Sequence, residues 1–202
     1  MNNILSKWEG QWENFEFYIH SRDPHLMKSW EEAETITSAI PMFSSGVKNF
    51  WEKACTTVTD ENTIIIGGWN VRTVNENELS IDWYKEDHSI LYSSSYTLDS
   101  IIERGLENKQ NFLLVSKDNE SSPFHYLLLM EPMPAIKENG LIPHFHFQYA
   151  SHKENIQNPE TGKLTYPMWY ATMCAGNVSV LDRCNIIRAL HRLPLRNSLP
   201  EL

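Results

Sequence analysis

Hydrophobic positions in the first quarter of the chain recur with the period of an α-helix. After Asp23 and Pro24, a pair typical of a helix N-terminus, apolar residues stand at i, i+1, i+4 and i+7. This stripe predicts a helix over about 23–36, and a second stripe of similar spacing predicts another over about 45–56. Both stripes are more typical of packing against a core than of a cofactor site.

From about residue 63 onward the period changes to that of β-strands. Short segments rich in β-branched and aromatic residues alternate with polar turn clusters, and no helical stripe separates them. The segments are 63–66, 79–84, 89–98, 111–117, 124–131 and 144–150. This spacing predicts an antiparallel sandwich or up-and-down barrel over about 63–170, with a bulge or bend at Gly67–Gly68.

The chain returns to a helical pattern near its end. Ser179 and Asp182 have the spacing of a capping box, and the apolar stripe that follows predicts a helix over about 180–192. With 202 residues, 41% of them hydrophobic, the chain is long enough for one domain with a real core. We therefore expect residues 1–202 to form a single domain.

Charge and composition narrow the classes of partner. The formal net charge is −9 and no sizeable basic cluster stands out, so we expect no nucleic-acid binding. The longest apolar runs fall far short of the ~20 residues that a transmembrane helix needs, so we expect no membrane insertion. The first residues lack the pattern of a signal peptide, which predicts a cytoplasmic protein for the chain as given. The three cysteines lack a Cys-x-x-Cys spacing and are expected to be buried free thiols.

The most informative segment is the predicted strand 144–150, which contains His144 and His146. Successive side chains of a strand face opposite ways, so the two imidazoles share one face while Phe145 and Phe147 share the other. Imidazoles at i and i+2 lie about 6–7 Å apart, close enough to bind one metal ion, and they suit zinc and other late first-row divalent ions. The alternative for the same pattern is a solvated polar face over an aromatic core face.

A zinc site needs more ligands than two histidines. Glu131 ends the predicted strand before His144 and would lie near it in a simple hairpin register, so its carboxylate is the best-placed third ligand. Other side chains could join only if the fold brings them in; they are His20, His25, Asp82, His88, His125 and His152. For each of these a surface or core position is the simpler interpretation.

Motifs for catalysis are absent from the sequence. It contains no hydrolase elbow, P-loop or dinucleotide-binding glycine motif, and no general base stands out, so we expect no enzymatic activity. Two segments, 8–12 and 166–170, are dense in aromatic residues. Such segments often plug one end of a barrel and can also line a ligand pocket.

Four features occur in a fixed order along the chain: LSKWEGQW at 5–12, the Asp23–Pro24 helix start, HFHF at 144–147 and TYPMWY at 165–170. Together with the C-terminal helix, they resemble the ZinT/YodA family of lipocalin-like zinc- and cadmium-binding proteins. The resemblance implies a mainly β, lipocalin-like (calycin) antiparallel barrel with flanking N-terminal and C-terminal helices. It also implies that His144 and His146 point into the barrel mouth, with the two phenylalanines outside under the helices.

The ligand set implied by the resemblance is incomplete in this chain. In the family three histidines hold the metal, and two of them correspond to His144 and His146. The third follows an acidic residue that corresponds to Glu131, and Pro132 stands at the histidine's position here. The resemblance therefore implies an atypical site of His144, His146 and Glu131 that binds Zn²⁺ or another divalent metal more weakly than three histidines would. Family members are often periplasmic or extracellular.

Two functions stay open on this basis. One is binding of a divalent metal, zinc or cadmium, by a lipocalin-like protein. The other is a lipocalin-like module without metal, whose barrel mouth accepts a small apolar or aromatic ligand. In that case His144 and His146 would donate hydrogen bonds to the ligand.

Overall fold

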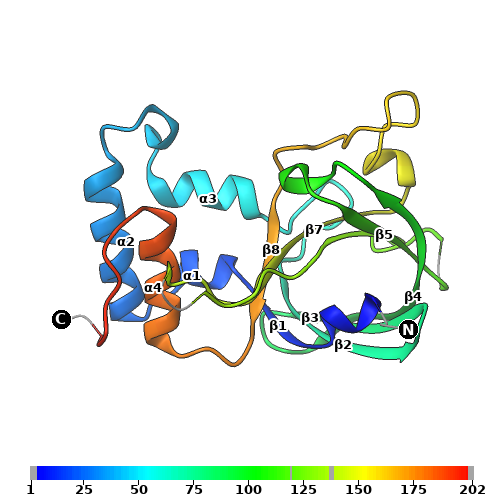
Figure 1. The fold of residues 1–202 in the computed structure, drawn as a ribbon, viewed down its shortest axis with the longest axis horizontal. Coiled ribbons are helices and arrows are strands. Elements are labelled where there is room, and N and C mark those ends of the chain that lie inside the picture. The colour runs from blue at the N-terminus through cyan, green and yellow to red at the C-terminus, as the bar shows by residue number, and fades with distance from the viewer. Residues whose placement is uncertain (1–3, 119, 137–138, 200–202) are drawn as a thin grey trace.

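A closed barrel of eight antiparallel strands forms the main body of the protein (Figure 1). The structure is a computed structural model that describes residues 4–118, 120–136 and 139–199. Each strand pairs with its neighbours in sequence, and β8 pairs with β1 to close the barrel. The predicted lipocalin-like antiparallel barrel with flanking helices is confirmed. The first and last three residues of the predicted domain lie outside the described residues.

The strands are β1 (Gly10–Asn14), β2 (Ile66–Asn75), β3 (Glu78–Lys85), β4 (Ile90–Ile102), β5 (Asn111–Ser116), β6 (Tyr126–Met130), β7 (His144–Ala150) and β8 (Ala171–Ala175). The α-helices are α1 (Glu16–His20), α2 (Pro24–Thr37), α3 (Val47–Cys55) and α4 (Val180–Leu190). Short 3-10 turns are η1 (Ile4–Trp8), η2 (Pro41–Phe43), η3 (Leu106–Asn108) and η5 (Lys153–Asn155).

The barrel begins earlier and ends later in the sequence than the predicted range of 63–170. β1 pairs with β2 on one side and with β8 on the other, so Trp12 stands opposite both Trp69 and Ala175. β1 and β8 have only five residues each, too few for a period of two to stand out among the surrounding aromatic residues. The aromatic segment 8–12 therefore supplies part of a barrel strand as well as a plug.

A backbone contact between β2 and β3 explains the glycine pair in β2. The register of the two strands shifts between Ile66 and Gly68. A Cβ atom on Gly67 would stand 2.2 Å from the backbone oxygen of Lys85. Only glycine permits this approach, and the predicted bulge at Gly67–Gly68 is confirmed.

Aromatic side chains fill the inside of the barrel. Ring centroids lie 4.6 Å apart for Trp69 and Trp83, and 4.5 Å apart for Trp69 and Phe147. η1 closes one end of the barrel, where the indole of Trp8 donates a hydrogen bond of 3.0 Å to the backbone oxygen of Met130. The interior is therefore a packed core.

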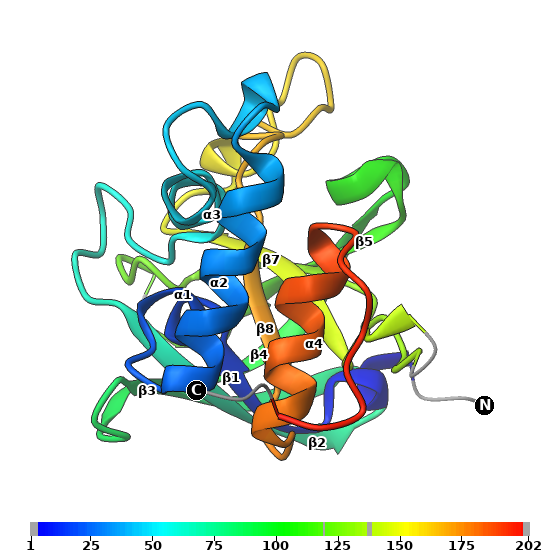
Figure 2. The same cartoon turned by 90° about the vertical axis from the view of Figure 1, so that its left-hand side faces the viewer.

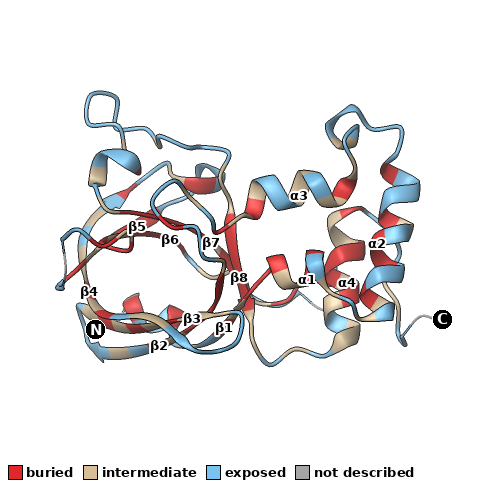
Figure 3. Cartoon of the chain, turned by 180° about the vertical axis from the view of Figure 1, so that it is seen from behind, coloured by how far each residue is buried: buried red, intermediate tan, exposed pale blue. Residues whose placement is uncertain are grey.

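Within the described residues, α1, α2, α3 and α4 lie together on one side of the barrel, next to β8 (Figure 1). α2 and α4 run side by side in Figure 2, and Figure 3 shows their buried positions gathered between them. At the start of α2 the carboxylate of Asp23 accepts hydrogen bonds from the amides of His25 and Leu26. α4 starts with a capping box between Ser179 and Asp182. Both predicted helix starts are confirmed.

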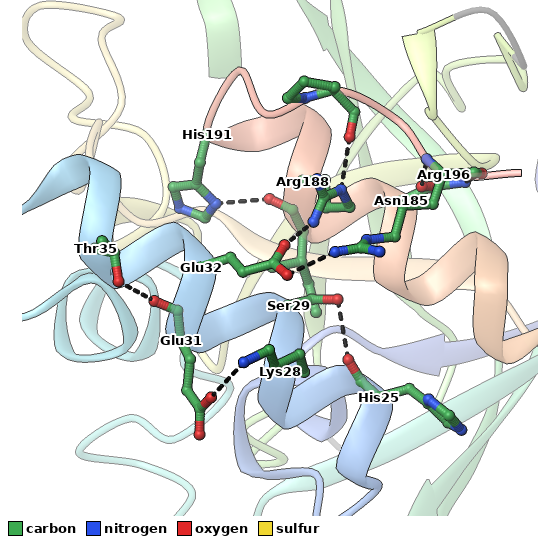
Figure 4. A network of polar contacts seen from close by, with 12 residues as sticks. His25, Lys28, Ser29, Glu31, Glu32, Thr35, Asn185, Arg188, His191 and Arg196 are labelled. Carbon is green, nitrogen blue, oxygen red and sulfur yellow. Dashed lines mark hydrogen bonds and ion pairs between the residues drawn. The ribbon is translucent and has the colours of Figure 1, made fainter. Parts of the chain in front are cut away.

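Polar contacts hold the helices together (Figure 4). Glu32 of α2 accepts hydrogen bonds from Arg188 of α4 and, at 2.7 Å, from Arg196 in the C-terminal segment. His191, which ends α4, donates from Nδ1 to the backbone oxygen of Ile187. Its Nε2 accepts a hydrogen bond of 2.8 Å from the indole of Trp51 in α3. Three helices are thus linked into one layer beside the barrel.

α3 connects this helical layer to the barrel wall (Figure 1). At its end the backbone oxygen of Ala54 accepts a hydrogen bond of 2.7 Å from the amide of Tyr170, immediately before β8.

Among the residues that the structure describes, no helix has the length and hydrophobicity to span a membrane.

Candidate metal centre

The side chains of β7 alternate between two faces as expected. The resemblance implies that the histidine face points into the barrel, but the opposite face does. Phe145 and Phe147 are fully buried in the barrel core, with ring centroids 5.6 and 4.5 Å from that of Trp69. His144 and His146 therefore lie on the outer face, toward the helices, and the prediction that they point into the barrel is wrong. The physical reason is burial, because the closed interior favours the two apolar phenylalanine rings over the two polar imidazoles, which are less costly at the cleft.

A cleft of about 730 Å³ lies along this outer face, between the barrel wall and the helical layer. Its walls come from α3, α4, β7 and β8, and they are mostly apolar. His144, His146 and Glu107 line one part of the cleft. The helices thus shield the histidines, and the side chain of His146 is only 15% exposed.

Each histidine uses its Nδ1 atom for a hydrogen bond within the protein. Nδ1 of His144 lies 2.6 Å from the backbone oxygen of Ile142, which can only accept. Nδ1 of His146 lies 2.8 Å from Oγ1 of Thr172, whose own proton is donated to the backbone oxygen of Tyr170 at 2.7 Å. Assigned from these partners, the neutral form of each ring carries its proton on Nδ1 and an unshared electron pair on Nε2. Metal-binding histidines are held in the same way, with one ring nitrogen hydrogen-bonded to the protein and the other left to bind the metal.

Glu107 comes from η3, a turn after β4 that no motif predicts. Nε2 of His146 lies 3.4 Å from Oε1 of Glu107, while Oε2 accepts a hydrogen bond of 2.7 Å from Lys109. Hydrogen bonding from His146, followed by that from Lys109, lowers the pKa of Glu107 to about 2. The carboxylate is therefore ionised at neutral pH.

The backbone of η3 is strained where it presents this carboxylate. Glu107 and Asn108 have φ angles of +54° and +56°, in the left-handed region that non-glycine residues seldom adopt. The buried side chain of Asn111 holds the turn, because its Oδ1 accepts a hydrogen bond of 2.7 Å from the amide of Leu106. Strain of this kind is typical of segments that position functional groups.

The two imidazoles are close to each other and one of them is held neutral. Their ring centroids lie 6.0 Å apart in an edge-to-face arrangement. Burial lowers the pKa of His144, so this ring stays neutral at physiological pH. Among the described residues, no group of three His, Cys, Asp or Glu side chains is already gathered around one point as a complete metal site. A metal ion at this position would therefore require a small movement of these side chains.

Glu131 lies elsewhere. Its carboxylate pairs with Lys7 of η1 at 2.7 Å, at the end of the barrel that η1 closes. Along β6, Leu127 and Leu129 point into the barrel and Leu128 points out, and continuing this alternation directs Glu131 away from the histidine face. The hairpin register predicted that the backbones would be close, but it did not predict which way the side chain points.

Comparison with known proteins gives one informative match. No family model and no curated protein matches the sequence. Among solved structures, the Zn(II)-bound ZinT-like domain of Streptococcus pneumoniae AdcA matches with a TM-score of 0.52 and 16% sequence identity. The alignment covers 93% of this chain and 89% of that chain. This chain has a ZinT-like fold. At this level of identity the likeness extends to the fold, and the bound zinc ion is a property of the streptococcal domain.

Of the further candidates, three have side-chain contacts outside the lining of the cleft. Asp82 pairs with Arg72 at 2.8 Å, His20 lies 3.7 Å from Glu52, and the ring of His125 packs against Tyr126. Within the described residues, the lining of the cleft contains only two histidines, His144 and His146.

Sequence reasoning missed Glu107 and Thr172, and the signal for the two differs. Glu107 lies in a polar turn that resembles any other, so no local pattern marks it. Thr172 follows the aromatic segment 166–170 by two positions, and this closeness to a candidate ligand-lining segment is the signal that marks it. Tyr170 itself packs on His146, with 5.3 Å between ring centroids.

Proposed function

We propose that this ZinT-like protein binds a divalent metal ion, with zinc as the first candidate, through His144, His146 and Glu107 on the outer face of the barrel. One observation carries the proposal. With the His146 proton on Nδ1, where it faces Thr172, Nε2 of His146 and Oε1 of ionised Glu107 are both acceptors, and they face each other at 3.4 Å. Two acceptors at this distance repel unless a proton or a cation lies between them.

The separation suits a metal ion. Two ligands of a tetrahedral zinc ion, each 2.0–2.2 Å from the metal, stand roughly 3.3 Å apart. A good charge-assisted hydrogen bond between the same groups would be shorter, at about 2.7–2.9 Å. The 3.4 Å between Nε2 of His146 and Oε1 of Glu107 is therefore closer to the spacing of two ligands than to that of an ion pair.

The remaining donors fit zinc as well. Both imidazoles have Nδ1 engaged, by the backbone oxygen of Ile142 and by Thr172, so Nε2 is the available donor of each ring. Nitrogen from imidazole and oxygen from one carboxylate suit zinc, and cadmium accepts similar donors. Three protein ligands leave a fourth position for water or another molecule. The function that we propose is binding of the metal ion.

Zinc titration tests the proposal against a simple ion pair between His146 and Glu107. Untagged protein is freed of metal with a chelator and titrated with ZnCl₂ by calorimetry, as wild type and as His146→Ala. We expect one zinc ion per wild-type chain and no binding at this site in the variant. Equal binding by the two proteins, or none by the wild type, would contradict the proposal and leave a protonated His146 as the partner of Glu107.

A further inference from the structure

The cleft is larger than a metal ion needs. Its volume is about 730 Å³, within the range of about 300–1,000 Å³ that small-molecule sites occupy. Across from the histidines the wall is formed by Phe50 and Trp51 of α3, Ile186 and Leu190 of α4, and Met168. An apolar wall facing a few convergent polar groups is the usual composition of a small-molecule site.

The open position of the proposed metal centre faces this apolar space. His144, His146 and Glu107 all line the same cleft, so a metal held by them has the cleft on its remaining side. The barrel side is closed, because Phe145 and Phe147 fill the interior behind the histidines. A fourth ligand must therefore come from the cleft.

The net charge of the proposed metal centre determines whether an anionic or a neutral fourth ligand is favoured. Metal-binding imidazoles are neutral, and Glu107 contributes one negative charge, so Zn²⁺ with these three ligands carries a net charge of +1. Lys109 adds a positive charge on the far oxygen of Glu107 at 2.7 Å. The site therefore has an excess of positive charge, and an anionic donor is favoured at the open position over a neutral one.

We propose that this cleft binds a monoanionic carboxylate with an aromatic or branched aliphatic body. Its carboxylate occupies the open position of the metal, and its apolar part fills the space between α3 and α4. This inference rests on the proposed metal site. The sequence analysis expects a small apolar or aromatic ligand in the barrel mouth, whereas this inference places such a ligand on the outside of the barrel.

The test uses two probes, 2-naphthoate and 4-phenylbutyrate, and the neutral alcohol 2-naphthalenemethanol. Each is titrated by calorimetry into the full chain, zinc-loaded and metal-free. At least one carboxylate is expected to bind the zinc-loaded protein ten times or more tightly than the metal-free protein. The alcohol is expected to show no such zinc dependence.

A matched pair of variants distinguishes carboxylate binding in the cleft from zinc binding. Met168 lines the cleft and is 72% exposed, and Met42 is 61% exposed and lies in η2, outside the cleft lining. Met168→Glu adds a negative charge at the cleft and should weaken carboxylate binding about tenfold or more without weakening zinc binding. Met42→Glu should change neither.

The outcomes distinguish the two proposals. If zinc binds to the wild type but neither carboxylate binds more tightly in its presence, the carboxylate site is refuted and the metal site stands. Carboxylate binding that depends on zinc but is equally affected by both methionine variants would also refute this cleft as the site. If zinc itself does not bind, both proposals fall together.

Discussion

Nε2 of His146 on strand β7 lies 3.4 Å from Oε1 of Glu107 in the turn that follows β4. The contact joins two segments that are distant in sequence, and the cleft between barrel and helices lies beside it. Lys109 holds the other oxygen of the same carboxylate, so Glu107 has one oxygen left for a cation.

Thr172 should matter for metal affinity without touching the metal. Thr172→Val keeps the shape of the side chain but removes the oxygen that accepts from Nδ1 of His146. We expect zinc binding to weaken by about 10–100-fold, the usual effect of losing an outer partner of a histidine ligand. Thr172→Ser retains the hydroxyl group and should bind zinc nearly as the wild type does. Equal calorimetric affinities for the serine and valine variants would argue against this role.

Asn111 should position Glu107 through the turn. Asn111→Ala removes the acceptor for the amide of Leu106 and leaves that buried amide without a partner. The free energy of unfolding should fall by about 1–3 kcal/mol in urea titrations. Zinc affinity should fall as well, because Glu107 is no longer held in its strained conformation. The neighbouring exposed Gln110 provides the control, and Gln110→Ala should leave both quantities unchanged.

Phe147 tests which face of β7 is inside the barrel. Because its ring is fully buried among the aromatic side chains of the core, Phe147→Ala should lower the free energy of unfolding by about 3–5 kcal/mol. Tyr166 is 56% exposed, and Tyr166→Ala should cost far less. A mild effect for Phe147→Ala in denaturant unfolding would mean that this ring does not form part of the core.

The stability of the metal-free protein should fall in mildly acidic solution. Burial lowers the pKa of His191 below its usual value near 6.5, and its Nε2 accepts a hydrogen bond from Trp51, which protonation would break. The unfolded chain takes up a proton near pH 6.5 while the folded chain does not. Stability is therefore complete above that pH and is lost as the pH falls toward the lower folded-state pKa. His144 contributes in the same direction, because burial lowers its pKa too.

Urea unfolding across pH 5–8 measures this effect. His191→Gln is less stable at every pH, but its stability should vary less with pH than that of the wild type. The side chain of His20 is half-exposed beside Glu52, and His20→Gln is the matched control, for which the wild-type pH dependence is expected. If His191→Gln and the wild type lose stability in parallel as the pH falls, another group is responsible.

The sequence predicts the architecture well because the barrel strands and long helices carry periodic patterns. β7 shows the limit of this reasoning. Alternation places His144 and His146 on one face, which the structure confirms, but the pattern is the same whichever face is inside. Packing with Trp69 and Trp83 decides which face of β7 is inside the barrel. These residues come from other strands, so the local pattern of β7 carries no information about them.

The third member of the candidate site illustrates a second limit. The hairpin predicts Glu131 as the third ligand because it is near His144 along the chain, whereas Glu107 approaches His146 from a turn in a different part of the barrel. Contacts between turns depend on the closed barrel and on strained backbone angles at Glu107 and Asn108. Neither feature can be read from residue spacing alone.

A comparison of two glutamate variants tests the proposed site most directly. Glu107→Gln and Glu131→Gln remove the same charge, but only Glu107 faces His146, and Glu131 pairs with Lys7. In calorimetric zinc titrations, Glu107→Gln should weaken binding by about 10–100-fold relative to the wild type, and Glu131→Gln should leave it unchanged. If instead Glu131→Gln weakens zinc binding and Glu107→Gln does not, the metal lies at the barrel end near η1, and the proposed site on the outer face is wrong.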